Sequence, residues 1–443
     1  MRFRVSAKSD TAAPPRRKLG LWMCMALAMG NMIGSGIFLL PASLGPFGGI
    51  SIAGWAVSSA GAVLLALVFA RLSRVVRGTG GPYVFARAGF GELPAFLIAW
   101  GYWISTWTTN AALAVAFVSY GSLFWPRLAT DPITATVTGL ASIWLLTWVN
   151  VRGVHTAGVV QLVTTILKLL PLAAIAFIGI FYIDLDHFRP FNASDQAPFA
   201  ALTATVALTL WAFLGLETGT VPAEDVENPE RTIPRATVLA TVAAAVVYIL
   251  GTAAVMGVIP SSQLSGSNAP FADAARVMWG GWAAGFIGFG AAVSCFGALN
   301  GWLLVQGQIP MAAARDGLFP ARFATVSERG TPVFGLVFSS VLASLLLVMN
   351  YTRGLVDQFT FILLLATLNT LVPYVVCSMV ELSMKIRSGE RIHWPLVLLS
   401  AGAFVYSLWA IAGAGQEIVY WGFMLLVAGL PVFVWMQWQK KRR

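Results

Sequence analysis

Charged residues are scarce in this chain. Only 10% of its 443 residues are Asp, Glu, Lys or Arg, whereas a soluble domain has about 25%. The mean hydropathy is +0.78, and no polar segment is long enough to form a separate soluble domain. The composition therefore excludes a soluble globular protein and indicates an integral membrane protein.

Cysteine and histidine are rare as well. Cys24, Cys295 and Cys377 lie in apolar runs and the three histidines are scattered at loops, which predicts buried thiols rather than a disulfide or a metal site. The chain has no nucleophile triad, P-loop or nucleotide-binding fingerprint. We therefore expect neither an enzyme nor a bound cofactor or metal ion.

Apolar runs of about 20 residues, the length that crosses a bilayer as a helix, follow one another along most of the chain. They predict an all-α protein with twelve transmembrane helices. The runs cover residues 20–41, 48–71, 91–124, 132–150, 157–183, 200–220, 235–259, 279–308, 333–350, 356–383, 394–413 and 417–438.

Basic residues gather on one side of these predicted spans. The N-terminal tail, the loops after every second span and the C-terminus together hold 23 of the 28 Lys and Arg residues. The positive-inside rule then places both termini in the cytoplasm. Topology thus explains the net charge of +10 without a nucleic-acid partner. The basic run Arg16–Lys18 resembles a signal peptide, but the apolar run after it is too long, so we expect an uncleaved first span.

The first span contains the sequence GNMIGSGIFLLPASLG, with Gly30, Gly34 and Gly36 near its centre and Pro41 behind them. Each glycine inside a helix costs about 1 kcal/mol relative to alanine. A helix that breaks in the membrane persists only where protein or a cavity covers its free backbone groups. The amides at the start of the second half-helix suit a carboxylate. Close helix packing through small residues is an equally consistent interpretation of this stretch alone.

The sixth span reads LTLWAFLGLETGTVPAEDVENPER and is interrupted by Gly215, Gly219 and Pro222. Glu217 lies at membrane depth, where a carboxylate indicates function by default, although a neighbouring hydroxyl could simply satisfy it. The two interrupted spans occupy corresponding places in two sets of five. This pattern indicates an inverted-repeat transporter with its substrate site at the bilayer midplane.

Four motifs carry a family resemblance: GNMIGSGIFLLPASL, GGPYVFARAGFG, WAFLGLE followed by VENPERTIPRA, and NAPFADAAR with a downstream GW. They resemble the amino acid–polyamine–organocation superfamily, and within it the basic amino acid/polyamine antiporters, over nearly the whole chain. The resemblance implies a five-plus-five inverted-repeat (LeuT-like) fold with broken helices 1 and 6. It divides the chain into a cytoplasmic tail (1–19), a ten-helix core (20–383), and two further helices with a basic C-terminus (384–443). It also implies an inner-membrane homodimer.

The resemblance assigns a substrate site. Ser35 and Gly36 would bind the substrate carboxylate, and the backbone carbonyls of Met32, Trp211 and Leu214 would accept hydrogen bonds from the α-ammonium. This assignment agrees with the site expected from the glycine-interrupted spans alone, since two broken helices offer hydrogen-bond donors on one side and acceptors on the other.

Other roles follow from the same resemblance. Trp302 would stack on the cationic side chain, a contact of about 0.5–2 kcal/mol, and Asn110 would contact the distal end of the substrate. Glu217 would be the proton-sensing group, because burial disfavours the charged form of a carboxylate. The residues expected to form gates are Tyr102, Trp211, Phe359 and Tyr374. Without the resemblance, each aromatic would be assigned to the core and Asn110 to contacts between helices.

Two features depart from the pattern of the arginine/agmatine exchangers, one group of these antiporters. Lys168 lies in the fifth span, where it would take the place of sodium in related carriers and predicts sodium-independent transport; a snorkelling lysine is the alternative. In the distal pocket, Ala366 replaces a serine, while Ser105 and Thr106 add hydroxyls. Repulsion between Lys168 and a cationic substrate, about 2 kcal/mol at 8 Å, is comparable to the gain from Trp302.

The leading hypothesis is therefore a sodium-independent antiporter that exchanges a basic amino acid for its decarboxylation product or a polyamine, of the arginine/agmatine or ornithine/putrescine type. A proton-coupled permease or a neutral amino acid exchanger is the alternative that Lys168 and Ala366 favour. A channel is less consistent with a single central site between broken helices, because a channel needs a continuous polar pore.

Overall fold

The structure is a computed structural model that describes residues 20–76, 81–152, 170–217, 226–328 and 330–442. Every regular element in these ranges is helical. The α-helices are α1 (Leu21–Met32), α2 (Ser35–Leu44), α3 (Ile50–Val75), α4 (Pro82–Phe90), α5 (Glu92–Gly121), α6 (Arg127–Thr130), α7 (Pro132–Val151), α9 (Pro198–Leu210), α10 (Pro229–Val258), α11 (Ser261–Leu264), α12 (Pro270–Trp279), α13 (Gly281–Arg315), α14 (Val333–Met349), α15 (Leu355–Ser388), α16 (Trp394–Ala412), α17 (Gln416–Val427) and α18 (Gly429–Arg442).

Seven helical stretches among the described residues are long and apolar enough to cross a membrane. They are α3, α7, α10, α13, α15, α16 and the consecutive pair α17 and α18. Shorter apolar helices cover Leu21–Gly30, Gly36–Phe47, Leu170–Tyr182, Pro198–Phe213 and Val333–Met349. The prediction of an all-helical protein with several membrane spans is therefore confirmed for the described part of the chain.

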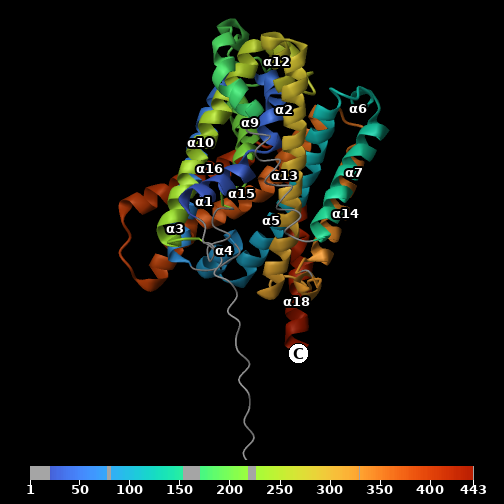
Figure 1. The fold of residues 1–443 in the computed structure, drawn as a ribbon. Helices are drawn as coiled ribbons and strands as arrows, with labels where there is room; N and C mark the ends of the chain where they lie inside the picture. The colour runs from blue at the N-terminus through green and yellow to red at the C-terminus, as the bar shows by residue number, and fades with distance from the viewer. Residues whose placement is uncertain (1–19, 77–80, 153–169, 218–225, 329, 443) are drawn as a thin grey trace, which may run out of the picture.

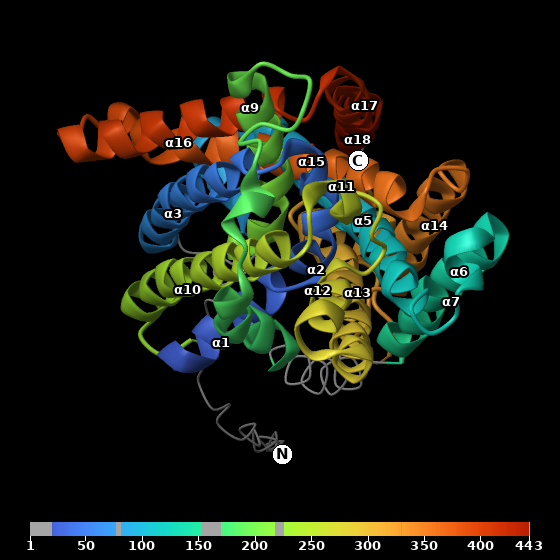
Figure 2. The ribbon, with the colours of Figure 1, turned by 90° about the horizontal axis from the view of Figure 1, so that it is seen from above.

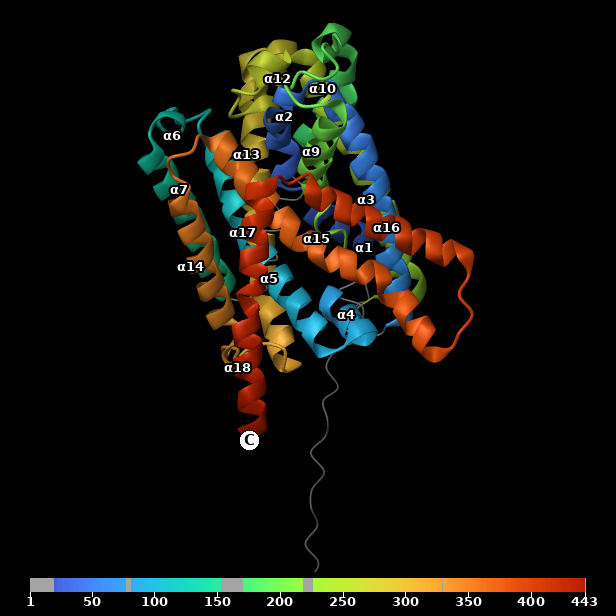
Figure 3. The ribbon, with the colours of Figure 1, turned by 180° about the vertical axis from the view of Figure 1, so that it is seen from behind.

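The long helix α5 lies in the middle of the molecule and packs against α13 and against α15. Seen from above, α3, α10 and α16 lie along one side and α7 and α14 along the other (Figure 2). Helices α17 and α18 run down the outside beside α5 (Figure 3). Helices α5 and α13 both contact α2, and α15 contacts α2 and α9.

The first span is interrupted at the predicted position. Helix α1 ends at Met32 and α2 begins at Ser35; between them, Ile33 has ψ 90° and Gly34 has φ −125° and ψ −142°. Pro41 lies inside α2 without ending it. A Cβ on Gly36 would lie 2.6 Å from Cδ1 of Trp211. Glycine at position 36 therefore allows the second interrupted span to approach the first one closely.

The second interruption follows α9. That helix ends at Leu210, and the 3₁₀ turn η4 (Trp211–Phe213) leads to an extended Leu214 and to Gly215 at φ +99°. The backbone amide of Ile50, after α2, donates to the carbonyl of Phe191, before α9 (2.6 Å). Helix α9 therefore begins near the end of α2 and returns to the level of the break, and both helices lie in the upper half of Figure 1.

One end of the molecule collects basic segments. Helix α4 and the C-terminus lie at the same end, opposite α12 (Figure 1). The Tyr83 hydroxyl in α4 donates to Asp316 just after α13 (3.0 Å), and Arg71 of α3 forms two hydrogen bonds to Glu381 of α15 (2.6 and 2.8 Å). The ends of α3, α13 and α15 that carry basic residues thus meet at one end of the protein.

The last predicted span, residues 417–438, is divided into α17 and α18 at Ala428. The indole NH of Trp100 donates to the carbonyl of Leu425 (3.0 Å), and a Cβ on Gly429 would lie 2.8 Å from the same indole ring. The Trp100 side chain binds a backbone carbonyl within the span and packs against its backbone, and this insertion explains why the helix divides there. Hydropathy alone could not indicate it.

Candidate functional site

The site begins with the bare N-terminus of α2. The first amides of a helix have no partner within that helix, and the aligned peptide dipoles make this end positive. The N-cap residue of α2 is Gly34, which has no side chain to accept hydrogen bonds from the first amides. Backbone donors at Ser35 and Gly36 therefore face the break, which suits an anionic group such as a carboxylate.

A small cavity lies at the break. Its lining comes from α1 and α2, from α5, from the η4 region and from α13: Met32, Gly34, Gly36, Thr109, Leu113, Trp211, Leu214 and Trp302. Its volume is about 20 Å³, which is room for about one water molecule. Ligand sites that hold small molecules have volumes of about 300–1,000 Å³, so this conformation is contracted around its centre.

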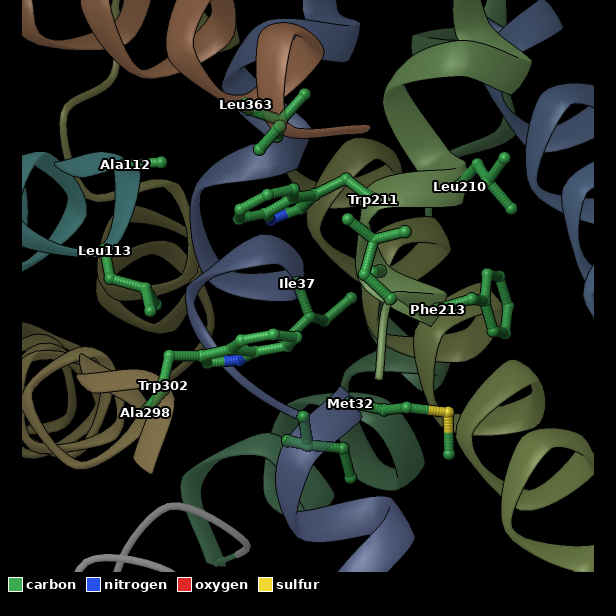
Figure 4. Close-up of a cluster of buried hydrophobic side chains, with 14 of the residues drawn as sticks. Met32, Ile37, Ala112, Leu113, Leu210, Trp211, Phe213, Ala298, Trp302 and Leu363 are labelled. Atoms are coloured by element: carbon green, nitrogen blue, oxygen red, sulfur yellow. The ribbon is translucent and has the colours of Figure 1, made fainter. Parts of the chain in front are cut away.

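Two tryptophans dominate the cavity. Trp211 and Trp302 are 5% and 7% exposed, and both lie beside α2, with Leu113 reaching toward them from α5 (Figure 4). Each indole offers a π face, which attracts a cation within about 6 Å. The cavity thus combines helix-end donors, aromatic faces and the backbone of an interrupted helix.

Five of the predicted substrate-site residues share this cavity: Met32, Gly36, Trp211, Leu214 and Trp302. The backbone of Ser35 opens α2, but the Ser35 side chain lies outside the described part of the structure. Lys168 also lies outside the described residues.

Four other predicted substrate contacts are buried but do not line the described cavity. Ser105 and Thr106 donate their hydroxyls to carbonyls of their own helix, at Tyr102 and Trp103 (2.7 Å each). Asn110 donates through Nδ2 to Oε1 of Gln306 in α13 (2.8 Å), and Ala366 is fully buried in α15. In this conformation they support the packing of α5, α13 and α15 around the cavity.

Thr109 and Leu113 also line the cavity, and neither is among the predicted site residues. They are four residues apart, so they lie on one face of α5. Asn110 is the next residue after Thr109 and points to α13 instead. Nearly every residue of α5 from Ala95 to Tyr120 is buried, so no periodicity in the sequence indicated which face meets the cavity.

Glu217 lies just after the second break and is fully buried. The Tyr102 hydroxyl donates to its Oε1 atom, and the Tyr374 hydroxyl donates to Oε2 (2.5 Å). Two hydroxyl donors match an ionised carboxylate, which only accepts hydrogen bonds. A proton on Glu217 would turn one oxygen into a donor, so the hydrogen bond at that oxygen would reverse and the tyrosine hydroxyl would accept it. The carboxylate therefore links α5 and α15 to the second break.

The predicted gate residues lie in three kinds of place: at Glu217, at the cavity and away from both. Tyr102 and Tyr374 bind Glu217, and Trp211 lines the cavity. Phe359 is fully buried in α15 and does not line the described cavity. Among the described residues, no group of three or more His, Cys, Asp or Glu side chains could hold a metal ion.

The family follows from comparison with known proteins. A model of the amino acid permease family matches residues 19–436. The chain belongs to this family. It is therefore a multi-pass membrane transporter and not an enzyme.

Several curated proteins are similar to this permease. A cadaverine/lysine antiporter from Escherichia coli (strain K12) is 37% identical over 367 residues, which cover 81% of this chain and 82% of the relative. The putrescine transporter PotE from Haemophilus influenzae is 30% identical over 433 residues, covering 97% and 98%. The putrescine transporter PotE from E. coli K12 is 31% identical over 426 residues, covering 94% and 95%.

Proposed function

We propose that this permease exchanges a basic amino acid for a diamine or polyamine across the cell inner membrane. The observation that carries the proposal is the cavity in which the N-terminus of α2 meets the Trp211 and Trp302 indoles. Such a site offers donors to a carboxylate and π faces to a cation. The relatives named as cadaverine/lysine and putrescine transporters support this substrate class.

The substrate carboxylate binds the amides of Ser35 and Gly36 at the positive end of α2. Its α-ammonium donates to backbone carbonyls of Met32, Trp211 and Leu214, which border the cavity. The distal cation stacks on Trp302 and gains about 0.5–2 kcal/mol. A gain of this size gives selectivity and still permits release.

The contracted cavity implies that loading requires a conformational change. With room for about one water molecule, the site must expand before an amino acid fits. Glu217 couples this expansion to protons, because its two tyrosine partners belong to α5 and α15 while Glu217 itself follows the second break. A proton that reverses one tyrosine hydrogen bond then favours movement of these elements relative to one another.

The architecture that we propose has twelve spans, ten of them in a five-plus-five inverted repeat (20–383) and two more in residues 384–443. The support is the pair of interruptions after α1 and α9, with α9 running back toward the level where α2 begins. The gathering of basic segments at one end supports cytoplasmic termini. The resemblance to the basic amino acid/polyamine antiporters also supports a homodimer as part of the proposal.

Counterflow in liposomes tests the function. Purified protein is reconstituted with lysine, ornithine, arginine, cadaverine, putrescine or alanine inside, and uptake of labelled lysine and putrescine is measured. We expect uptake only against a loaded basic amino acid or diamine. Trp302→Leu is expected to weaken uptake of the cationic substrates about 2- to 30-fold. Uptake that does not depend on any internal substrate would refute exchange.

Sodium dependence tests the role proposed for Lys168. Its ammonium replaces the sodium ion of related carriers, so exchange is expected to continue unchanged when choline replaces sodium. A strict sodium requirement would contradict this assignment.

A neutral amino acid exchanger is the second candidate. The described lining of the cavity contains no acidic side chain, so nothing there fully balances a distal cation. The alanine arm of the counterflow assay separates the two candidates: exchange with alanine but not with lysine or diamines would favour the neutral substrate.

A further inference from the structure

A second, larger cleft lies at the basic end of the protein, between α3, α10 and α16. Its volume is about 660 Å³. Most of its wall is apolar and includes Leu67, Val238, Leu239, Pro395 and Leu399. Three arginines, Arg71, Arg74 and Arg235, also line it. It shares no lining residue with the cavity at the break of α1 and α2.

A smaller cleft of about 370 Å³ shares two of these arginines. Arg74 and Arg235 line both clefts, and Arg231 and Glu230 complete the smaller one. All four of its lining residues are charged, with three arginines against one carboxylate. The two clefts together therefore offer a cationic compartment joined to an apolar one.

The arginines differ in their partners. Arg71 binds Glu381 through two hydrogen bonds (2.6 and 2.8 Å), so this pair is neutral overall and forms a wall. Arg74 donates through Nε to the backbone carbonyl of Glu230 (3.1 Å). Among the described residues, no carboxylate oxygen lies within 4.0 Å of a nitrogen of Arg74 or Arg235. Both side chains are exposed and available to an anionic group.

The clefts lie where the protein surface changes from charged to apolar. Along α3, exposed Leu67 is about 10 Å from Arg74, and α10 places exposed Leu239 one turn after Arg235. Helix α3 lies between α10 and α16 on one side of the molecule (Figures 2 and 3). Trp394, at the start of α16, is 76% exposed, which is typical of a residue at the membrane–water interface.

We propose that these joined clefts bind an anionic phospholipid. The headgroup phosphate lies between Arg74 and Arg235, since a guanidinium pairs with phosphate oxygens in a forked geometry. An acyl chain lies along the apolar wall between Leu67 and Leu239. Basic clefts between transmembrane helices bind anionic headgroups in this way. A free phosphate ion would fill the cationic compartment and leave the apolar one without a ligand, so the joined shape favours a lipid.

Lipid binding to the purified, delipidated protein tests the proposal. Native mass spectrometry measures binding of phosphatidylglycerol and of phosphatidylcholine with the same acyl chains to the wild type, to R74Q/R235Q and to K440Q/K441Q. The last variant is a matched control, because it removes the same charge from exposed positions in α18. We expect the wild type and the control to prefer phosphatidylglycerol.

The affinity of R74Q/R235Q for phosphatidylglycerol should fall about 30-fold, because each basic residue near an anionic headgroup contributes a factor of about five. R74K/R235K retains both charges but loses the forked geometry, so its affinity should lie between that of the wild type and that of R74Q/R235Q. The proposal is overturned if R74Q/R235Q binds phosphatidylglycerol as tightly as the control, or if the lysine variant loses as much as the glutamine variant. It is also overturned if inorganic phosphate displaces the lipid from the wild type, since the apolar wall would then contribute nothing.

Discussion

Replacing Gly36 with alanine tests whether the close approach of Trp211 to α2 shapes the substrate cavity. A Cβ at position 36 would lie 2.6 Å from Cδ1 and 2.8 Å from Nε1 of Trp211, about 0.8 Å short of the 3.4 Å at which ordinary contact begins. The Cα of Ala212 follows at 3.5 Å, so the indole is the group that must move. Trp211 is 5% exposed and has little free space.

The expected effect follows from the cost of overpacking, which is about 1–3 kcal/mol in a well-packed interior. Because Trp211 borders the cavity, that cost falls on the substrate-binding geometry. We expect G36A to exchange lysine about 5- to 160-fold more slowly in the counterflow assay. The protein should remain folded, as thermal unfolding in detergent would show.

A matched control and a rescue make this prediction specific. Gly285 lies in α13, and a Cβ at that position would meet no described atom within 4 Å beyond its chain neighbours and the backbone of its own helix, so G285A should exchange normally. Trp211→Phe removes the overlapping ring atoms, and in the double variant G36A/W211F the two losses should be less than additive. Wild-type exchange by G36A, or strictly additive losses, would refute the reasoning.

Three further predictions concern other parts of the protein. Glu217→Ala removes the carboxylate that accepts hydrogen bonds from the Tyr102 and Tyr374 hydroxyls. The variant should still exchange substrate, but the pH profile of exchange should be flatter; an unchanged profile counts against proton sensing. Arg71→Gln leaves the buried Glu381 carboxylate unpaired; it should cost about 1–3 kcal/mol of stability, less than a fully buried pair because the Arg71 side chain is 45% exposed. R71Q/E381Q should recover most of the loss in thermal unfolding, and equal melting temperatures for both variants would contradict this. Asp131 caps α7, and the hydroxyl of Thr134 holds its pKa below the ordinary 3.8. Because the pKa of Asp131 is lower in the folded than in the unfolded protein, its carboxylate stabilises the fold above the unfolded pKa, and this stabilisation is lost as the pH falls through the folded pKa. D131A should therefore melt at a lower temperature than the wild type at pH 7 and at the same temperature in strong acid. A difference in melting temperature that does not depend on pH would exclude the cap as the cause.

The interruption of the first span could be predicted because its cause is local. Three glycines within seven residues weaken a helix at one place, and the chain leaves the helical conformation at Ile33 and Gly34. Pro41, by contrast, lies inside α2 without ending it, which shows that a single helix-breaking residue was not a sufficient signal. A helix can break inside the membrane only where protein or a cavity shields its unpaired backbone groups from lipid. The break therefore also predicted a site enclosed by other helices.

The side chains that meet at the break could not be predicted from residue type alone. Family resemblance points to Trp302, and this residue does line the cavity. The same resemblance points to Asn110 rather than Thr109, yet α5 is buried on all sides and turns Asn110 toward Gln306. The packing of α13 decided which face of α5 meets the cavity.

By itself, the sequence determined that this protein is helical, lies in a membrane, interrupts its first span and leaves the helical conformation again after Leu210, because hydrophobicity and glycine content act over short distances. The tertiary structure alone decided what surrounds those interruptions. Tyr102 and Tyr374 bind Glu217, from which they are 115 and 157 residues away in the chain. Arg74 and Arg235 line the same cleft, whose apolar wall comes from three helices. Such contacts depend on how buried helices pack against one another, and no local pattern in the sequence encodes that packing.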